Sequence, residues 1–230
     1  MKTIGLIGGM SWQSSLFYYK YINQLVAKQL GGAHSAKILM SSVDFSGIEK
    51  WSFENRWNDI GDRMAKEARR LQDAGADIIV LGTNTIHLTA VQIEQAITIP
   101  YLHIAKATGE AINQKQLKRV ALLGTKFTME KDFYTSILLN EHGLDVSIPN
   151  LEERGILQHI IYDELVKGKF TAEAKKKCVQ IINALKAKGA EGIILGCTEL
   201  PILIPENEVD LPVFDTTMIH SKAAVDFALG

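Results

Sequence analysis

GAEGIILGCTEL, residues 189–200, is an apolar run that ends at a glycine and is followed by a cysteine and two polar side chains. This pattern predicts a buried β-strand that stops at Cys197 and continues into a loop or the start of a helix. Open α/β folds bind their ligands at the carboxyl ends of strands, so the thiol would lie where ligands gather. A helix amino terminus nearby would lower the pKa of the thiol and favour the thiolate.

The same pattern occurs a second time, at residues 75–85, which read GADIIVLGTNT. The two stretches match almost position for position, and Thr83 stands where Cys197 stands. Other glycines keep nearly the same offset, because Gly8 and Gly124 are 116 residues apart and Gly82 and Gly196 are 114 residues apart. A solenoid would repeat every ~20–50 residues and more than twice. Two copies therefore predict two similar lobes.

Strand and helix patterns alternate within each copy, which indicates α/β lobes with parallel sheets and right-handed crossovers. We expect the first lobe to comprise residues 1–110 with a closing helix at 217–230, and the second to comprise residues 111–216. If the lobes are related by a pseudo-twofold axis, Thr83 and Cys197 approach one cleft, the active site, from opposite sides. This inference rests on the repeat alone.

The first strand is expected at residues 3–7 and ends in a tight Gly8-Gly9 turn whose backbone amides would face a ligand space. A helix should follow, with Ser11 as its N-cap. Its buried stripe is predicted to contain Leu16, Tyr19, Ile22 and Val26. The turn does not spell the GxGxxG motif, so a phosphate-binding loop is disfavoured.

The composition is that of an ordinary globular protein, with 47% hydrophobic and 22% charged residues. A net charge of −1 and a pI of about 6.6 give no reason to expect nucleic acid or an anionic membrane as a partner. The amino terminus lacks the apolar core of a signal peptide, and no run reaches the ~20 apolar residues of a membrane span. Two cysteines without CxxC spacing argue against a disulfide framework or a zinc site. We therefore expect a cytoplasmic protein.

Two thiols at the repeated positions would allow a stereocentre to be inverted. One base removes a proton from a carbon, and an acid on the other side returns one. A thiol has an unperturbed pKa of about 8.5, which suits this task once the pKa is lowered. The hydroxyl of Thr83 is far too weak an acid to supply an alkoxide base. The sequence thus predicts one competent base, Cys197, and one hydroxyl.

Four motifs, at residues 5–11 (GLIGGMS), 84–87 (NTIH), 123–129 (LGTKFTM) and 196–199 (GCTE), resemble the aspartate/glutamate racemase family, and most its aspartate racemase-like branch. The resemblance covers nearly the whole chain, in order. It implies a two-lobed α/β enzyme that racemises aspartate or glutamate without pyridoxal phosphate or metal, usually as a homodimer. It also implies that Cys197 removes the α-proton of the L enantiomer.

Family members typically carry a cysteine in each lobe, and this chain departs from them at Thr83. Thr83, or a water that it holds, would have to reprotonate the other face, so we expect turnover that favours the L substrate. One alternative is an arylmalonate decarboxylase-like enzyme, which uses a single cysteine. Another is an amino-acid-binding protein without catalytic activity.

Several further residues are candidates for binding the substrate. Neutral donors at strand ends could hold the α-carboxylate, Glu199 could tune the thiol, and Met10 could line the wall. A cation for the side-chain carboxylate could be Lys126, which its motif favours, or one of Arg56, Arg63, Lys167 and Lys169. Cys178, His87 and His220 are expected to be packing residues, and no spacing suggests a metal. The neutral donors are Asn84, Thr85, Thr125, Thr128 and Thr198, and Ser11 is a candidate for the first-lobe wall beside Met10.

Overall fold

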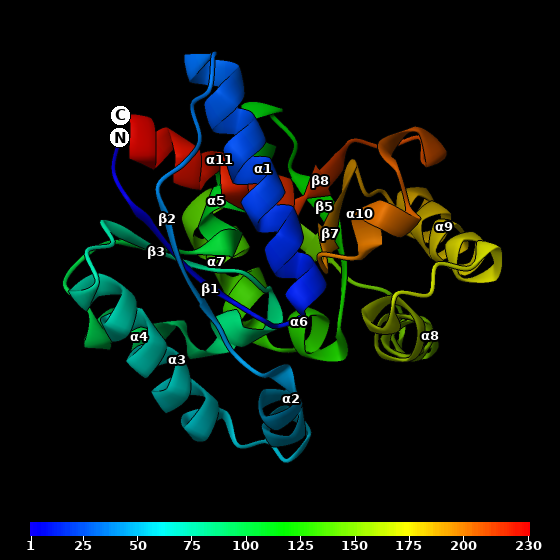
Figure 1. Ribbon diagram of the computed structural model, residues 1–230. Coiled ribbons are helices and arrows are strands. Elements are labelled where there is room, and N and C mark those ends of the chain that lie inside the picture. Colours follow the sequence, from blue (N-terminus) through cyan, green and yellow to red (C-terminus); the bar gives the residue numbers. More distant parts are fainter. The chain divides into compact units, whose positions relative to one another are not determined.

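Two four-stranded parallel sheets form the framework of the chain in the computed structural model, which describes residues 1–230 (Figure 1). The first sheet has the order β2-β1-β3-β4 and the second has the order β6-β5-β7-β8. The predicted α/β class and the internal repeat are therefore confirmed. The strands are β1 (Ile4–Gly8), β2 (Ile38–Ser42), β3 (Ile78–Leu81), β4 (Tyr101–Leu102), β5 (Arg119–Gly124), β6 (Asp145–Ser147), β7 (Gly192–Gly196) and β8 (Val213–Asp215).

Helices connect the strands in both halves of the chain. They are α1 (Trp12–Leu30), α2 (Phe45–Phe53), α3 (Trp57–Asp73), α4 (Ala90–Ala96), α5 (Ile104–Gln114), α6 (Lys126–Glu130), α7 (Asp132–His142), α8 (Leu151–His159), α9 (Ala172–Ala187), α10 (Leu200–Leu203) and α11 (Thr216–Leu229). A 3-10 helix, η1 (Thr85–Thr89), follows β3, and a π-helical turn, η2 (Ile160–Glu164), extends α8. No helix is long and apolar enough to cross a membrane.

The chain divides into two compact units that exchange their closing helices. Unit 1 comprises Met1–Ile104 and His220–Gly230, and unit 2 comprises Ala105–Ile219. Helix α5 follows the last strand of the first sheet but packs in unit 2, whereas α11 follows the last strand of the second sheet and packs in unit 1. Each unit is thus completed by a helix from the other half of the repeat.

Two buried tyrosines mark the same place in the two units. In unit 1, the hydroxyl of Tyr18 lies 2.9 Å from Nδ1 of His220, on α11. In unit 2, the hydroxyl of Tyr134 donates a hydrogen bond to Oγ1 of Thr108, on α5, across 3.2 Å. Both tyrosine side chains are completely buried. The exchanged helices therefore occupy corresponding positions.

The central strands are buried on both faces, as is usual for parallel sheets covered by helices. In unit 1, Ile7 and Ile79 belong to a core cluster that includes residues of α3, while Ile4 and Val80 belong to a second cluster with residues of α1 and α11. Helix α3 is followed by Gly75 with φ +97° and α9 by Gly189 with φ +102°. A left-handed residue at this position lets a helix end and turn into the next strand.

The buried face of α1 differs from the predicted stripe. Leu16 and Tyr19 are 58% and 55% exposed, and the buried residues are Ser14, Ser15, Tyr18, Ile22 and Val26. Ser15 faces inward because its Oγ accepts a hydrogen bond from the Gly9 amide across 2.7 Å. Because the buried face carries polar side chains, the spacing of hydrophobic residues does not identify it.

Candidate active site

Cys197 lies one residue beyond the end of β7, in unit 2, and its thiol is hydrogen-bonded to a carboxylate. The thiol donates to Oε2 of Glu199 across 3.1 Å. The Thr198 hydroxyl donates to the same oxygen across 2.7 Å. All three residues are buried, with exposed fractions of 8% or less. The GCTE motif is therefore a thiol, a hydroxyl and a carboxylate gathered at one strand end.

The pKa of the Cys197 thiol is raised well above its ordinary value, contrary to the prediction from the helix terminus. Burial is the largest cause, and the charge of Glu199 also raises the pKa. Hydrogen bonds from the backbone of Glu199 and Leu200 lower it but do not compensate. The following helix, α10, has only four residues, so its terminus is a weak source of positive potential. Cys197 is therefore a protonated thiol at rest.

Strand β5 brings a second group of residues to the same edge of the sheet. Gly124 pairs with Gly196 in the register, and a Cβ at Gly124 would lie 2.9 Å from the Gly196 carbonyl oxygen. Thr125 is the N-cap of α6, and its Oγ1 accepts from the Thr128 amide across 3.2 Å. The close approach of two glycines thus places the TKFTM segment beside the strand that carries Cys197.

Lys126 differs from the other cationic candidates. Its side chain is half-buried and forms no ion pair, while its backbone amide donates to Oε1 of Gln158 across 2.8 Å. The other cations lie on exposed surfaces. Three of them form ion pairs: Arg56 with Asp59 at 2.9 Å, Arg63 with Glu67 at 2.8 Å, and Lys167 with Asp163 at 3.3 Å. The fourth, Lys169, is exposed.

The unit 1 residues of the repeat lie at the ends of β1 and β3. Met10 and Ser11 follow β1, and Ser11 caps α1 by accepting from the Ser14 amide across 3.3 Å. The expected ligand-facing amide of Gly9 is occupied instead by Ser15. Asn84 and Thr85 are buried. The Gly82 amide donates to the Ile7 carbonyl across 2.8 Å, which joins these two strand ends.

His87 is the residue around which the Thr83 turn is held. Its Nδ1 lies 2.7 Å from the Thr83 carbonyl oxygen, and its Nε2 accepts from the Ile104 amide across 3.1 Å. Burial and the neighbouring His103 and His220 place its pKa well below the usual value. From the sequence, His87 was predicted only as a packing residue. Its place in the NTIH segment, two residues after Thr85, was the available signal.

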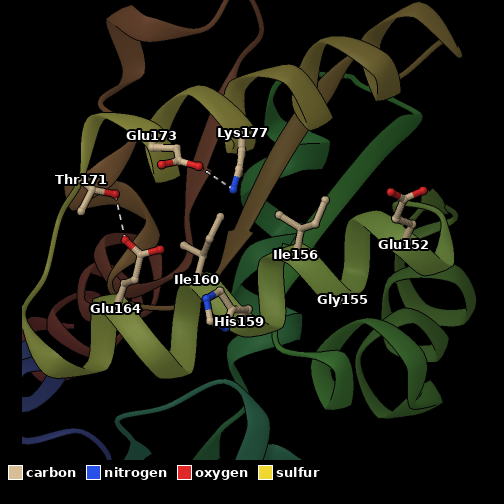
Figure 2. A pocket seen from close by; sticks show the side chains of 9 residues that line it. All are labelled: Glu152, Gly155, Ile156, His159, Ile160, Glu164, Thr171, Glu173 and Lys177. Carbon is tan, nitrogen blue, oxygen red and sulfur yellow. Dashed lines mark hydrogen bonds and ion pairs between the residues drawn. The ribbon is translucent and has the colours of Figure 1, made fainter.

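A hollow of about 600 Å³ lies elsewhere on unit 2 (Figure 2). One side is formed by α8 and η2, and the other by the start of α9. Two pairs of its side chains are in contact: the Thr171 hydroxyl donates to Glu164 across 2.8 Å, and Glu173 pairs with Lys177 at 2.9 Å. None of the residues predicted to bind substrate lines this hollow. It is therefore separate from the strand ends described above.

Cys178 gives a useful contrast to Cys197. It packs on the buried face of α9 with Ala174, Ile181, Ile182 and Leu185, as predicted. Burial raises the pKa of its thiol to about 12, and no carboxylate accepts its proton. No group of three or more His, Cys, Asp or Glu side chains is arranged to hold a metal ion.

The chain resembles racemases and their homologues in both sequence and structure. The sequence model of the Asp/Glu/Hydantoin racemase family matches residues 7–224. A solved structure of a candidate Asp/Glu racemase from Yersinia pestis is 45% identical, with a TM-score of 0.94 and complete coverage of both chains. An aspartate racemase homologue from Pyrococcus horikoshii OT3 is 35% identical, with a TM-score of 0.86 and complete coverage of both chains.

More distant relatives match over part of their length. The broad specificity amino-acid racemase RacX of Bacillus subtilis (strain 168) is 26% identical over 158 residues, which cover 69% of this chain and 67% of that protein. The glutamate racemase of Shewanella woodyi (strain ATCC 51908 / MS32) is 26% identical over 57% of this chain and 48% of that enzyme. The match thus spans about half the length of this glutamate racemase.

Proposed function

Because this chain belongs to the Asp/Glu/Hydantoin racemase family, and is therefore an isomerase of the type that does not use pyridoxal phosphate, we propose that it racemises aspartate or glutamate, with Cys197 removing the α-proton of the L enantiomer. The observation that carries this proposal is the hydrogen bond of 3.1 Å from the Cys197 thiol to Glu199. This hydrogen bond gives the thiol at the end of β7 its own proton acceptor.

The first step needs a thiolate, and Glu199 provides the route to it. The thiol proton passes to Oε2 of Glu199, and the resulting thiolate takes the proton from the α-carbon of the substrate. This leaves Cys197 as a thiol again, Glu199 protonated and the substrate as a carbanion. A thiolate whose conjugate acid has a raised pKa is a stronger base, which favours removal of a weakly acidic C–H proton.

Thr83 is proposed to serve the opposite face of the α-carbon, because it occupies the position in unit 1 that Cys197 occupies in unit 2. Its hydroxyl, or a water that it holds, returns a proton to the carbanion and yields the D enantiomer. The proton on Glu199 is then lost to solvent and the donor on the Thr83 side takes one from solvent, which restores the resting enzyme. A hydroxyl cannot begin the reverse reaction, since its pKa is far too high to give a base. Because the two enantiomers are equally stable, kcat/KM for racemisation is the same in both directions, and the asymmetry must lie in α-hydrogen exchange. We therefore propose an enzyme that exchanges the α-hydrogen of the L enantiomer readily, exchanges that of the D enantiomer poorly, and interconverts the two slowly.

The substrate would be held by neutral donors and one cation. We assign the α-carboxylate to the polar side chains at the strand ends, and the side-chain carboxylate to Lys126. The support for Lys126 is that the residue is half-buried and forms no ion pair. Met10 and Ser11 would line the wall. The neutral donors are Asn84, Thr85, Thr125, Thr128 and Thr198.

The deciding experiment measures exchange of the α-hydrogen in deuterium oxide for L and D aspartate and glutamate. Wild type should label the L enantiomers, and Cys197→Ser should lose this activity by at least about 100-fold, the usual effect of removing a catalytic base. Cys178→Ala, which removes the other thiol, is the matched control and should keep the rate. Undiminished exchange in Cys197→Ser would refute the assignment.

The same samples separate the two alternatives. Carbon dioxide release from an arylmalonate, without α-hydrogen exchange in amino acids, would indicate a decarboxylase. A rise in melting temperature with aspartate or glutamate, without exchange, would indicate a binding protein. We further propose that the enzyme is a cytoplasmic homodimer, which light scattering after size-exclusion chromatography and cell fractionation would test.

A further inference from the structure

The His87 imidazole is a neutral link between the Thr83 turn and the point where the chain leaves unit 1. A backbone amide can only donate, so the bond of 3.1 Å from the Ile104 amide requires a lone pair on Nε2. The proton of the neutral ring is therefore on Nδ1, which donates to the Thr83 carbonyl across 2.7 Å. The two contacts define one tautomer.

The Thr83 turn is held on both sides of its residue. The Thr83 amide donates to the Leu81 carbonyl across 2.9 Å, and the His87 amide donates to the Asn84 carbonyl across 3.1 Å. The hydrogen bond from Nδ1 of His87 is made by a side chain directly to the Thr83 carbonyl oxygen. The ring is 1% exposed and packs against His103, with ring centroids 4.7 Å apart. A buried ring in a crowded site has little freedom to move.

The two copies of the repeat differ at this position. With an offset of 114 residues, His87 corresponds to Pro201, which has no side-chain donor. In unit 2, the Cys197 carbonyl accepts instead from the Leu200 amide across 3.1 Å. In unit 2, the side chain of Cys197 itself is hydrogen-bonded, because its thiol donates to Glu199. In unit 1, the corresponding side-chain hydrogen bond is made by His87 to the backbone carbonyl of Thr83.

We propose that His87 is a positioning residue that orients Thr83 for the return of the proton to the substrate. This inference rests on the proposed function, because it takes Thr83 as the group that serves the second face. His87 does not touch the substrate and acts only through the turn. Its loss should therefore impair the formation of D product and spare the α-hydrogen exchange that depends on Cys197.

The test compares these two rates in one reaction. L-aspartate is incubated in deuterium oxide, and deuterium in the recovered L enantiomer is measured beside the D enantiomer formed. His87→Leu, which removes both contacts, should lower D formation at least tenfold while exchange stays within about threefold of wild type. His87→Asn, which can keep a donor near the Thr83 carbonyl, should restore part of the loss. His87→Gln, whose amide group sits nearer to Ile104, should restore less.

A double-mutant cycle checks that the effect passes through Thr83. In a Thr83→Ala background, His87→Leu should cause no further loss of D formation. His220→Gln is the matched control, because His220 is a buried histidine of the same cluster that contacts Tyr18 and Leu102 rather than Thr83. It should leave the ratio of the two rates unchanged.

The outcomes separate this inference from the proposed function. Equal loss of exchange and D formation in His87→Leu, or an undiminished effect in the Thr83→Ala background, would overturn the role of His87. If His87→Leu does not fold, the comparison of His87→Asn with His87→Gln decides, and equal D formation in the two overturns the role. Persistence of exchange in Cys197→Ser would instead refute the proposed function.

Discussion

The Cys197 thiol donates its proton to Oε2 of Glu199, two residues along the chain, across 3.1 Å. The same oxygen accepts from the Thr198 hydroxyl at 2.7 Å, so two neighbouring side chains donate to one atom of Glu199. The carboxylate opposes formation of the thiolate by its charge and assists it by accepting the proton. These two effects make different predictions for the pH profile and for the rate.

Replacing Glu199 by Gln should change rate and pH dependence in opposite senses. Without the negative charge, the pKa of Cys197 falls, because Glu199 is one of the causes that raise it. The alkaline rise of kcat/KM should therefore move to lower pH. Loss of the proton acceptor should lower the maximal rate about 100-fold. Alkylation of Cys197 against pH, followed by peptide mass spectrometry, measures the pKa directly. An unchanged alkylation profile would contradict this account.

Replacing Thr83 by Cys should add activity on the D enantiomer. A second thiol supplies the base that a hydroxyl cannot provide, so the rate from D-aspartate should rise at least about tenfold, a modest part of what a general base contributes. Thr83→Ser keeps a hydroxyl and is the matched control, which should remain biased towards the L enantiomer. Initial rates of α-hydrogen exchange in deuterium oxide are compared for each pure enantiomer. Equal exchange rates from both enantiomers in wild type would contradict the proposed role of Thr83.

Replacing Lys126 by Met should weaken binding of acidic substrates. A hydrogen bond to a charged group contributes about 1.5–3 kcal/mol, so KM for L-aspartate should rise about 10- to 100-fold. The effect on kcat should be smaller, because the contact exists in the ground state as well as in the transition state. Lys169→Met removes an exposed lysine without an ion pair and serves as the control. A normal KM in Lys126→Met would transfer the carboxylate contact to another group.

Acid should destabilise unit 1 through His220. Burial lowers the pKa of this residue to about 4, below the value of about 6.5 expected in the unfolded chain. The unfolded state therefore takes up the proton first as the pH falls. The stability contributed by the neutral ring is complete above about pH 6.5 and is lost progressively towards pH 4. The loss is about 3 kcal/mol at about 1.4 kcal/mol per unit.

Urea unfolding at several pH values between 7.5 and 4.5 measures this dependence. The side chains that face His220 include Tyr18 at 2.9 Å and the ring of His87, whose centroid is 5.7 Å away. His87 has a lowered pKa of its own and adds to the same trend. In His220→Gln the stability should depend less on pH. An identical slope in wild type and variant would contradict the prediction.

The repeat allowed much of the fold to be predicted. Apolar runs ending in glycine mark β3 and β7 because strands buried on both faces have continuous hydrophobic sequences. Helices α2 and α5 were not predicted, and α8 continues into a π-helical turn and a 3-10 turn. Sequence periodicity does not report these changes of hydrogen-bond pattern.

The chemistry of the strand ends was harder to foresee. Sequence identifies Cys197 and Glu199 as neighbours, but the sign of a pKa shift depends on burial and on the direction of the carboxylate, which only the folded structure defines. His87 was taken for a packing residue because its partners, Thr83 and Ile104, are backbone groups. Nearly every residue carries a backbone donor and a backbone acceptor, so the sequence does not reveal which of them a side chain will contact. The assignment of substrate-binding residues stays a prediction.

The exchange of α5 and α11 has a consequence for biosynthesis. The ribosome completes every strand of the first sheet long before it makes Ala224, Val225 and Ala228, which fill the core beside Ile4 and Val80. Until then one face of that sheet lacks part of its apolar cover, and exposed apolar surface during synthesis promotes aggregation. Helix α5, by contrast, emerges before the sheet against which it packs. Unit 2, which comprises Ala105–Ile219, can therefore be completed before unit 1, which waits for His220–Gly230.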